Sequence, residues 1–104
     1  MSAWEIRYTE KAKSDLDGFD ASSRRQITKA LEKVSGNPLP RREGGYGVEL
    51  RASLSDCLKV KLKAAGIRIV YKLERTETAM RIIVIGMRAG AEVYREAERR
   101  LGRR

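Results

Sequence analysis

The sequence contains no histidine and only one cysteine, and these two shortages exclude several common kinds of active site. A Ser-His-Asp triad and a Cys-His pair both need an imidazole to move protons, so this chain can build neither. The lone Cys57 cannot form an internal disulfide, and without a histidine to activate it we expect a buried, reduced thiol rather than a nucleophile. The sequence also lacks a Gly-rich phosphate loop, a Cys/His cluster and an obvious inward-facing pair of acidic residues. We therefore expect no metal ion and no other cofactor.

Long hydrophobic runs are absent as well. No stretch of about 18 apolar residues occurs, so we expect no membrane-spanning segment. The N-terminal residues M-S-A-W-E-I-R lack the apolar core of a secretion signal, which favours a cytoplasmic location. The length of 104 residues is enough for a single domain, residues 1–104, with one small core.

What the chain has in abundance is positive charge. It carries 23 lysines and arginines against 14 acidic residues, a formal net charge of +9. Such an excess favours a polyanionic partner such as nucleic acid, the ribosome, an acidic protein or an anionic membrane. The alternative is a basic surface that only keeps the protein in solution.

Hydrophobic periodicity predicts an N-terminal strand and two helices in the first third of the chain. Residues 4–8 alternate between apolar and charged side chains, as a half-buried strand does. Thr9 is a good N-cap for a first helix, and Ser22 or Ser23 can cap a second. The only two prolines follow shortly afterwards and prevent the second helix from continuing. The two helices would form a hairpin.

Four short apolar stretches follow a polar, glycine-rich loop at residues 41–47. They lie at about 48–50, 57–63, 67–73 and 80–87, separated by polar turns, and an amphipathic segment at 91–100 ends the pattern. This order predicts an α+β fold. It consists of an N-terminal strand, the helical hairpin, a four-stranded antiparallel meander and a short C-terminal helix.

Positive side chains gather in the predicted sheet. Lys59 and Lys61 alternate with apolar residues in C-L-K-V-K-L, so they share one face of their strand. Arg68 follows the next turn, and hairpin pairing brings it near one of the two lysines, depending on the register. We expect the other face to pack against helices and this face to be open and positive. Ligands often neutralise such clusters, although a solvated basic strand face gives the same pattern.

Two further candidate residues lie at the end of the sheet and beyond it. Arg88 ends the last strand in V-I-G-M-R, and arginine grips phosphate through two parallel hydrogen bonds. Tyr94, in E-V-Y-R-E-A, is either a core aromatic of the last helix or a group that stacks on a base or contacts a ribose hydroxyl. Four fixed cations and a phenol suggest a site that holds a phosphate and stabilises extra negative charge on it.

RNA supplies its own nucleophile, the 2′-hydroxyl, so such a site can cleave RNA without a histidine. Neighbouring cations lower the pKa of a lysine, which allows Lys61 or Lys59 to act as the base, or to act electrostatically. Arg68 and Arg88 would hold the phosphate and its transition-state charge. Arginine is a poor general acid at its normal pKa, so the proton donor to the leaving group stays open.

Three runs of the sequence resemble the RelE family of bacterial toxin–antitoxin systems: D-C-L-K-V-K-L-K-A-A-G-I-R-I-V-Y-K-L, R-I-I-V-I-G-M-R and E-V-Y-R-E-A. The resemblance extends over nearly the whole chain and is most specific between residues 56 and 99. It implies a small basic toxin with a microbial-RNase-like α+β fold. Such toxins enter the ribosomal A site and cut the mRNA codon there, without a metal ion, and a cognate antitoxin neutralises them.

The resemblance also implies roles for individual residues. The two alternating lysines, Lys59 and Lys61, would be base or charge stabilisers. Arg68 and Arg88 would be phosphate ligands, and Tyr94 a stacking and orienting group.

Two more cations are candidate RNA-binding residues. Arg51 sits where the family often has an RNA-contacting arginine, and Lys63 continues the alternation of Lys59 and Lys61. The chain departs from the family where some members have K-R-x-R, because Met87 and Gly90 replace two cations and reduce the basic rim.

The alternative within the same fold is a ParE-like toxin, which acts on DNA gyrase and has no nuclease activity. ParE-like toxins generally lack the complete lysine–arginine–tyrosine set, so its presence here favours RNA cleavage. A non-catalytic RNA-binding domain is a third interpretation.

Overall fold

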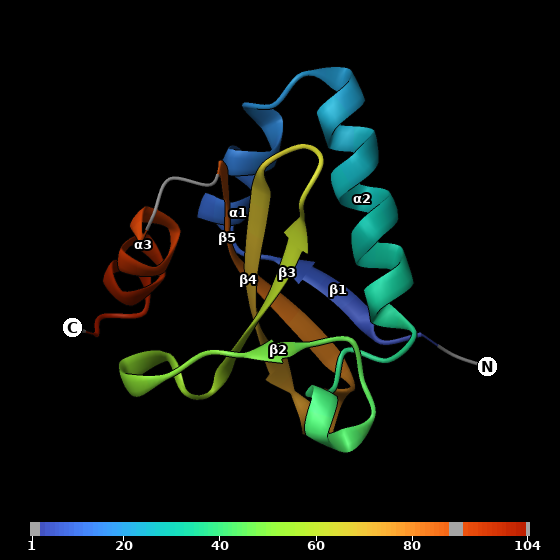
Figure 1. The fold of residues 1–104 in the computed structure, drawn as a ribbon, viewed down its shortest axis with the longest axis vertical. Coiled ribbons are helices and arrows are strands. Elements are labelled where there is room, and N and C mark those ends of the chain that lie inside the picture. Colours follow the sequence, from blue (N-terminus) through green and yellow to red (C-terminus); the bar gives the residue numbers. More distant parts are fainter. Residues whose placement is uncertain (1–2, 88–90, 104) are drawn as a thin grey trace.

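The computed structural model describes residues 3–87 and 91–103, and over these residues the chain has three α-helices and one five-stranded sheet (Figure 1). The predicted α+β fold class is confirmed. In chain order the elements are β1 (Glu5–Tyr8), α1 (Glu10–Asp17), α2 (Ala21–Ser35), β2 (Val48–Glu49), β3 (Cys57–Leu62), β4 (Ile67–Glu74), β5 (Ala79–Met87) and α3 (Glu92–Arg100). Within the described ranges, no helix has the length and apolar character needed to cross a bilayer.

The strand order in the sheet is β1-β5-β4-β3-β2. Strands β2 to β5 pair with their sequence neighbours in antiparallel fashion, which is the predicted meander. Strand β1 lies at the other edge and runs parallel to β5, with Glu5 opposite Ala79 and Tyr8 opposite Ile82. The sheet is therefore mixed, because β5 is parallel to β1 and antiparallel to β4. Two helices and three strands separate β1 from β5 in the chain.

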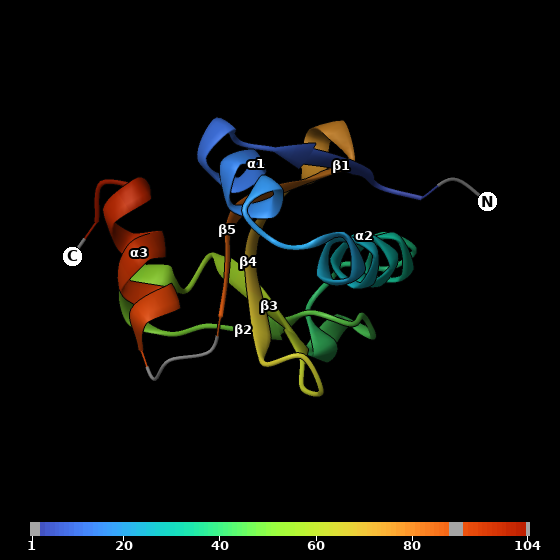
Figure 2. The same ribbon diagram turned by 90° about the horizontal axis from the view of Figure 1, so that it is seen from above.

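Helices cover both faces of this sheet (Figure 2). Helices α1 and α2 lie on one face, over the larger core cluster that includes Ile27 and Leu31. Helix α3 lies on the other face and buries Val93 and Ala97 there. The prediction that the face bearing the lysines is open is thus wrong at one end, where α3 covers Cys57 of the same face.

Side-chain caps fix where the first two helices begin. The Thr9 hydroxyl accepts a backbone N–H of the first turn of α1, as predicted. Asp20 caps α2, since its Oδ1 lies 2.7 Å from the N atom of Ser23. The prediction of Ser22 or Ser23 as that cap is wrong because α2 already starts at Ala21, which places both serines inside its first turn.

A β-bulge in β5 widens the surface on which α3 rests. Tyr71 of β4 pairs with Ile82, but the preceding Val70 pairs with Val84, so Ile83 has no partner on β4. As a result Ile83 and Val84, although consecutive, both belong to the apolar cluster under α3. Strict alternation would have directed one of them to the opposite face.

The loop at residues 41–47 contains a short 3₁₀ turn, Arg41–Glu43, and a close approach of two backbone segments. A Cβ atom at Gly45 would lie 2.0 Å from the carbonyl oxygen of Leu39. We therefore expect Gly45→Ala to destabilise the protein by about 1–3 kcal/mol, the usual cost of overpacking. Urea denaturation measures the change. Gly18→Ala is the matched control, because its Cβ would meet nothing closer than 3.4 Å, and an equal loss in both variants would contradict the clash.

Candidate functional site

The hairpin of β3 and β4 brings three of the predicted cations to one face. Lys61 lies directly opposite Arg68, and Lys59 lies opposite Val70. Val70 is fully buried in the cluster beneath α3, so the lysines and Arg68 share the face that α3 partly covers. The sequence did not decide which of the two lysines lies opposite Arg68, and the observed register pairs Arg68 with Lys61.

Helix α3 places Tyr94 beside these cations. The Nζ atom of Lys59 lies 5.5 Å from the centroid of the Tyr94 ring, and the Cζ atom of Arg68 lies 5.7 Å from it. Both distances are within the range of cation–π contacts. Tyr94 also packs against the apolar cluster of α3, so it is a core aromatic and a neighbour of the cations at once.

The cations change the acid–base properties of Lys61. The charges of Lys59 and then of Arg68 lower the pKa of Lys61 below its ordinary value. The Lys61 side chain is exposed, so water can carry protons to and from it. A lysine that loses its proton more readily than usual is suited to act as a base.

Cys57 lies on the same face but takes no part in this site. It is a free cysteine with 1% of its surface exposed, which confirms the expected buried thiol. Burial raises its pKa to about 11, so the nucleophilic thiolate is scarce near neutral pH.

The hydroxyl of Tyr94 is buried, and no described residue forms a hydrogen bond with it. A buried polar atom without a partner carries a desolvation cost that the fold does not recover. A ligand that bonded this oxygen after a small movement of the side chain would remove that cost. The position of Tyr94 beside two cations makes an anionic or polyhydroxylated ligand the natural candidate.

Arg51 borders the site from the side of α3. It is exposed and precedes the short 3₁₀ turn Ala52–Leu54. Together with Tyr94 and Arg95 it lines a recess of about 340 Å³.

Lys63 borders the site from the opposite end of the hairpin. Strand β3 ends at Leu62, one residue earlier than predicted, so Lys63 lies in the turn and is exposed. It shares a hollow of about 210 Å³ with Lys61 and Arg68.

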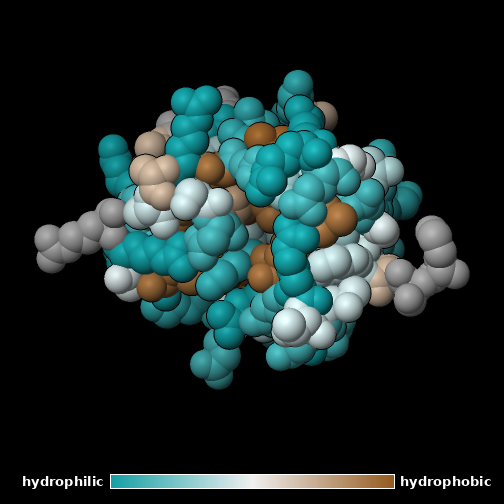
Figure 3. Space-filling model, turned by 90° about the horizontal axis from the view of Figure 1, so that it is seen from below, coloured by the Kyte–Doolittle hydropathy of each residue, from teal (hydrophilic) through white to brown (hydrophobic). Residues whose placement is uncertain are grey.

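A larger basic groove, of about 610 Å³, lies between α2 and β3. Cationic residues that line it include Lys33, Arg41 and Lys63, and none of the described lining residues is acidic. Tyr46 contributes a half-exposed ring there, 5.7 Å from the Nζ atom of Lys33. Seen from the side of β2, the surface is mostly hydrophilic, with small separate hydrophobic areas (Figure 3).

Two of the sequence-based expectations fall on residues that the structure does not describe. Arg88 and Gly90 lie outside the described residues. Met87, the other substitution of a family cation, is 57% exposed, so an apolar side chain stands on the surface at the end of β5.

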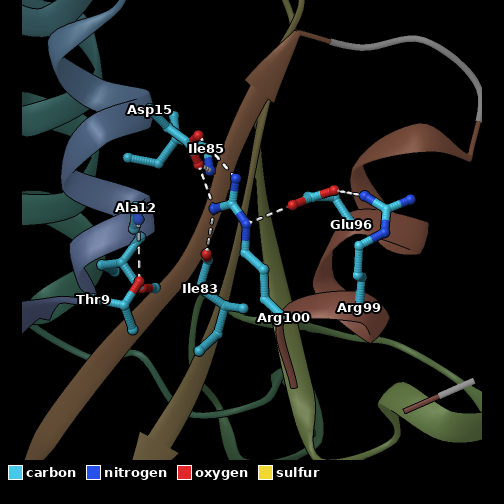
Figure 4. A network of polar contacts seen from close by, with 9 residues as sticks. Thr9, Ala12, Asp15, Ile83, Ile85, Glu96, Arg99 and Arg100 are labelled. Atoms are coloured by element: carbon cyan, nitrogen blue, oxygen red, sulfur yellow. Dashed lines mark hydrogen bonds and ion pairs between the residues drawn. The ribbon is translucent and has the colours of Figure 1, made fainter. Parts of the chain in front are cut away.

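The contacts that hold α3 in place could not be predicted from the sequence. Arg100 of α3 and Asp15 of α1 form a double ion pair, with Nη1–Oδ2 and Nη2–Oδ1 distances of 2.7 and 3.0 Å (Figure 4). The partners are 85 residues apart, and each looks like an ordinary surface charge of an amphipathic helix. No local pattern in the sequence could have paired them.

Comparison with known proteins gives consistent matches along the chain. Residues 6–91 match the family model of the ParE toxin of the type II toxin–antitoxin system parDE. The mRNA interferase toxin RelE of Escherichia coli strain K12 is 31% identical over 99 residues, covering 95% of this chain and 98% of the relative.

Two solved structures agree with this match. A doubly substituted form of E. coli toxin RelE in the free state superposes with a TM-score of 0.77 at 28% identity, covering 96% of this chain and 99% of that one. The same toxin in complex with a peptide of its antitoxin RelB gives a TM-score of 0.71 at 28% identity, with 92% and 95% covered.

Proposed function

Because the chain belongs to the RelE/ParE family of toxins from type II toxin–antitoxin systems, we propose that it is a ribosome-dependent endoribonuclease that cleaves mRNA in the ribosomal A site. The observation that carries the proposal is the contact of Tyr94 with Lys59 and Arg68, next to Lys61 on the same sheet face. The similarity to an mRNA interferase supports it further. The protein would act in the cytoplasm, where its substrate is.

The reaction needs no metal ion and no cofactor. The 2′-oxygen of the ribose attacks the adjacent phosphorus while the bond from phosphorus to the 5′-oxygen breaks, which leaves a cyclic phosphate and a 5′-hydroxyl. Lys61, with its lowered pKa, accepts the proton of the 2′-hydroxyl. The leaving 5′-oxygen takes its proton from water.

The remaining residues bind and orient the substrate. Arg68 and Lys59 offset the charge that develops on the phosphoryl oxygens, and Arg88 is assigned the same role from its place in the sequence. Tyr94 stacks on a base and orients the ribose. Two RNA-binding residues, Arg51 at the recess and Lys63 at the end of the hairpin, contact the flanking RNA backbone.

Primer extension on mRNA from translating ribosomes tests the proposal. We expect new ends within the A-site codon when the toxin is added. Unbroken mRNA at a saturating toxin concentration would refute the proposal.

The description of the matching family model favours a second candidate, a ParE-like inhibitor of DNA gyrase. Such a toxin would bind its target without cleaving RNA, so the lysine–arginine–tyrosine contacts would be dispensable. A supercoiling assay separates the two functions, because the gyrase inhibitor would block supercoiling and leave A-site codons intact.

The hydroxyl of Tyr94 gives a test that separates function from stability. Since no described residue bonds this buried oxygen, Tyr94→Phe should leave the free energy of unfolding unchanged or raise it by about 1 kcal/mol. Loss of a hydrogen bond to the substrate should slow codon cleavage roughly 10-fold. Thermal denaturation and single-turnover cleavage of the same protein measure both. A less stable variant with normal cleavage would contradict the assignment.

We propose that a cognate antitoxin inhibits the toxin by displacing α3. The +9 charge and the basic groove beside α2 suit an acidic or amphipathic segment, and the similar E. coli toxin has been solved with a peptide of its antitoxin. Helix α3 is short and offers few buried apolar side chains beyond Val93 and Ala97.

Removal of α3 would take Tyr94 away from the cations. We therefore expect amides of residues 91–101 to exchange hydrogen faster in the antitoxin complex than in the free toxin. Equal protection in the two states, with RNA binding still blocked, would mean that the antitoxin inhibits by another route.

A further inference from the structure

Arg100 occupies a polar junction between α3, α1 and the free edge of β5 (Figure 4). Besides its double ion pair with Asp15, its guanidinium donates to the carbonyl oxygen of Ile83 at 2.9 Å and to Oε2 of Glu96 at 2.8 Å. Asp15 in turn accepts the backbone N–H of Ile85 at 3.0 Å. Polar groups of three elements, α1, α3 and β5, therefore meet at Arg100.

The junction supplies hydrogen-bond partners to backbone groups of β5 that have no neighbouring strand. Strand β1 pairs with β5 only as far as Ile82, so beyond that point the side of β5 that faces β1 has no strand beside it. The carbonyl of Ile83 and the N–H of Ile85 would lack a partner there, and Arg100 and Asp15 satisfy them. Ile83 is also the bulged residue that helps to form the floor under α3.

This ion pair is better shielded from water than the ion pair between Arg103 and Asp56. The side chains of Arg100 and Asp15 are 14% and 19% exposed. Arg103 and Asp56, which also tie the end of the chain down, are 29% and 43% exposed. Shielded bidentate pairs hold their geometry more firmly than exposed ones, which contribute little.

We propose that Asp15 and Arg100 are positioning residues that hold Tyr94 over Lys59 and Arg68. Arg100 lies six residues after Tyr94 on the same helix, roughly 9 Å along its axis. Fixing the guanidinium to α1 and to the edge of β5 sets the rotation and height of α3 on the sheet. The inference rests on the proposed cleavage, in which Tyr94 orients the substrate, and it names residues that never touch the RNA.

Three variants test the proposal. Arg100→Ala removes all the contacts of the guanidinium, and Arg100→Lys keeps the charge but cannot reproduce the fork that grips Asp15 and Ile83. Arg99→Ala is the matched control, because Arg99 is the preceding residue of the same helix and its side chain is 70% exposed, in contact with Glu96 of the same helix. Circular dichroism verifies that each variant is folded.

The first measurement is hydrogen exchange, which does not depend on catalysis. Amides of residues 95–101 should exchange faster in Arg100→Ala and in Arg100→Lys than in the parent and in Arg99→Ala, while amides of β4 keep their protection. Unchanged exchange in both Arg100 variants overturns the proposal. A parent protein that cuts no codons would refute the proposed function but leave this measurement decisive for the contact.

The second measurement is a mutant cycle with Tyr94. Arg100→Ala should lower kcat for codon cleavage by about 10²-fold with little change in KM, because the binding cations remain and only the placement of Tyr94 is lost. In a Tyr94→Ala background the same substitution should change kcat by less than about 2-fold. A full effect of Arg100→Ala in that background would show that it does not act through Tyr94 and would overturn the proposal.

Discussion

Replacement of Lys61 by alanine is expected to slow codon cleavage by about 10²–10³-fold, the usual cost of removing one preorganised charged group from a transition state. The fold should be unaffected, because the Lys61 side chain is exposed and lies near the C-terminal end of β3, whereas the buried residues Cys57 and Leu58 lie at its start. Single-turnover cleavage on programmed ribosomes measures the rate. Lys29→Ala is the control, since it removes one exposed lysine on α2 and lowers the net charge by the same amount as Lys61→Ala.

The pH dependence distinguishes a base from a charge stabiliser. A base works in its neutral form, so the rate should rise with pH up to the pKa of Lys61, which its neighbours lower. Lys59→Ala removes the largest cause of that lowering, so the midpoint of the profile should move to higher pH. Lys61→Arg keeps a positive charge but cannot lose a proton near neutral pH. Normal cleavage by Lys61→Arg would assign Lys61 a purely electrostatic role.

Free RNA is expected to be cut at least about 10³-fold more slowly than the same codon in the ribosomal A site. The chain has no histidine, so its site can stabilise charge but moves protons less well than an imidazole pair. Cleavage then depends on a fixed alignment of the 2′-hydroxyl with the leaving oxygen, and positioning alone can lower a barrier by several kcal/mol.

A short RNA that carries the A-site codon, incubated with and without programmed ribosomes, measures the difference. The binding of this RNA to the toxin is determined in parallel, so that weak binding is not mistaken for slow chemistry. Comparable rates on and off the ribosome would show that the protein alone completes the site.

Local patterns in the sequence were enough to predict the antiparallel meander and the cations on β3 and β4, but not the parallel pairing of β1 with β5. The alternation of Lys59 and Lys61 with apolar residues places both lysines on one face of β3, whatever the position of this strand in the sheet. The short turn before β4 then restricts Arg68 to the neighbourhood of these lysines, and only the register was missing. The observed pairing of Arg68 with Lys61 supplied it.

Contacts that depend on tertiary packing could not be predicted in the same way. The contact between Tyr94 and Lys59 exists because α3 crosses the sheet on the face opposite α1 and α2, and helical periodicity does not state which face a helix covers. The bulge at Ile83 and the pairing of Asp15 with Arg100 set that crossing. Neither leaves a mark in the sequence, because a bulge looks like one more apolar residue in a strand.

The measurement that tests the central claim most directly uses ribosomes programmed with two mRNAs. One carries an ordinary codon in the A site, and the other carries the same codon with a single 2′-deoxyribose at the cleaved position. If the substrate supplies the nucleophile, the toxin cuts the first codon and leaves the second intact. Cleavage of both codons, or of neither, would contradict the account.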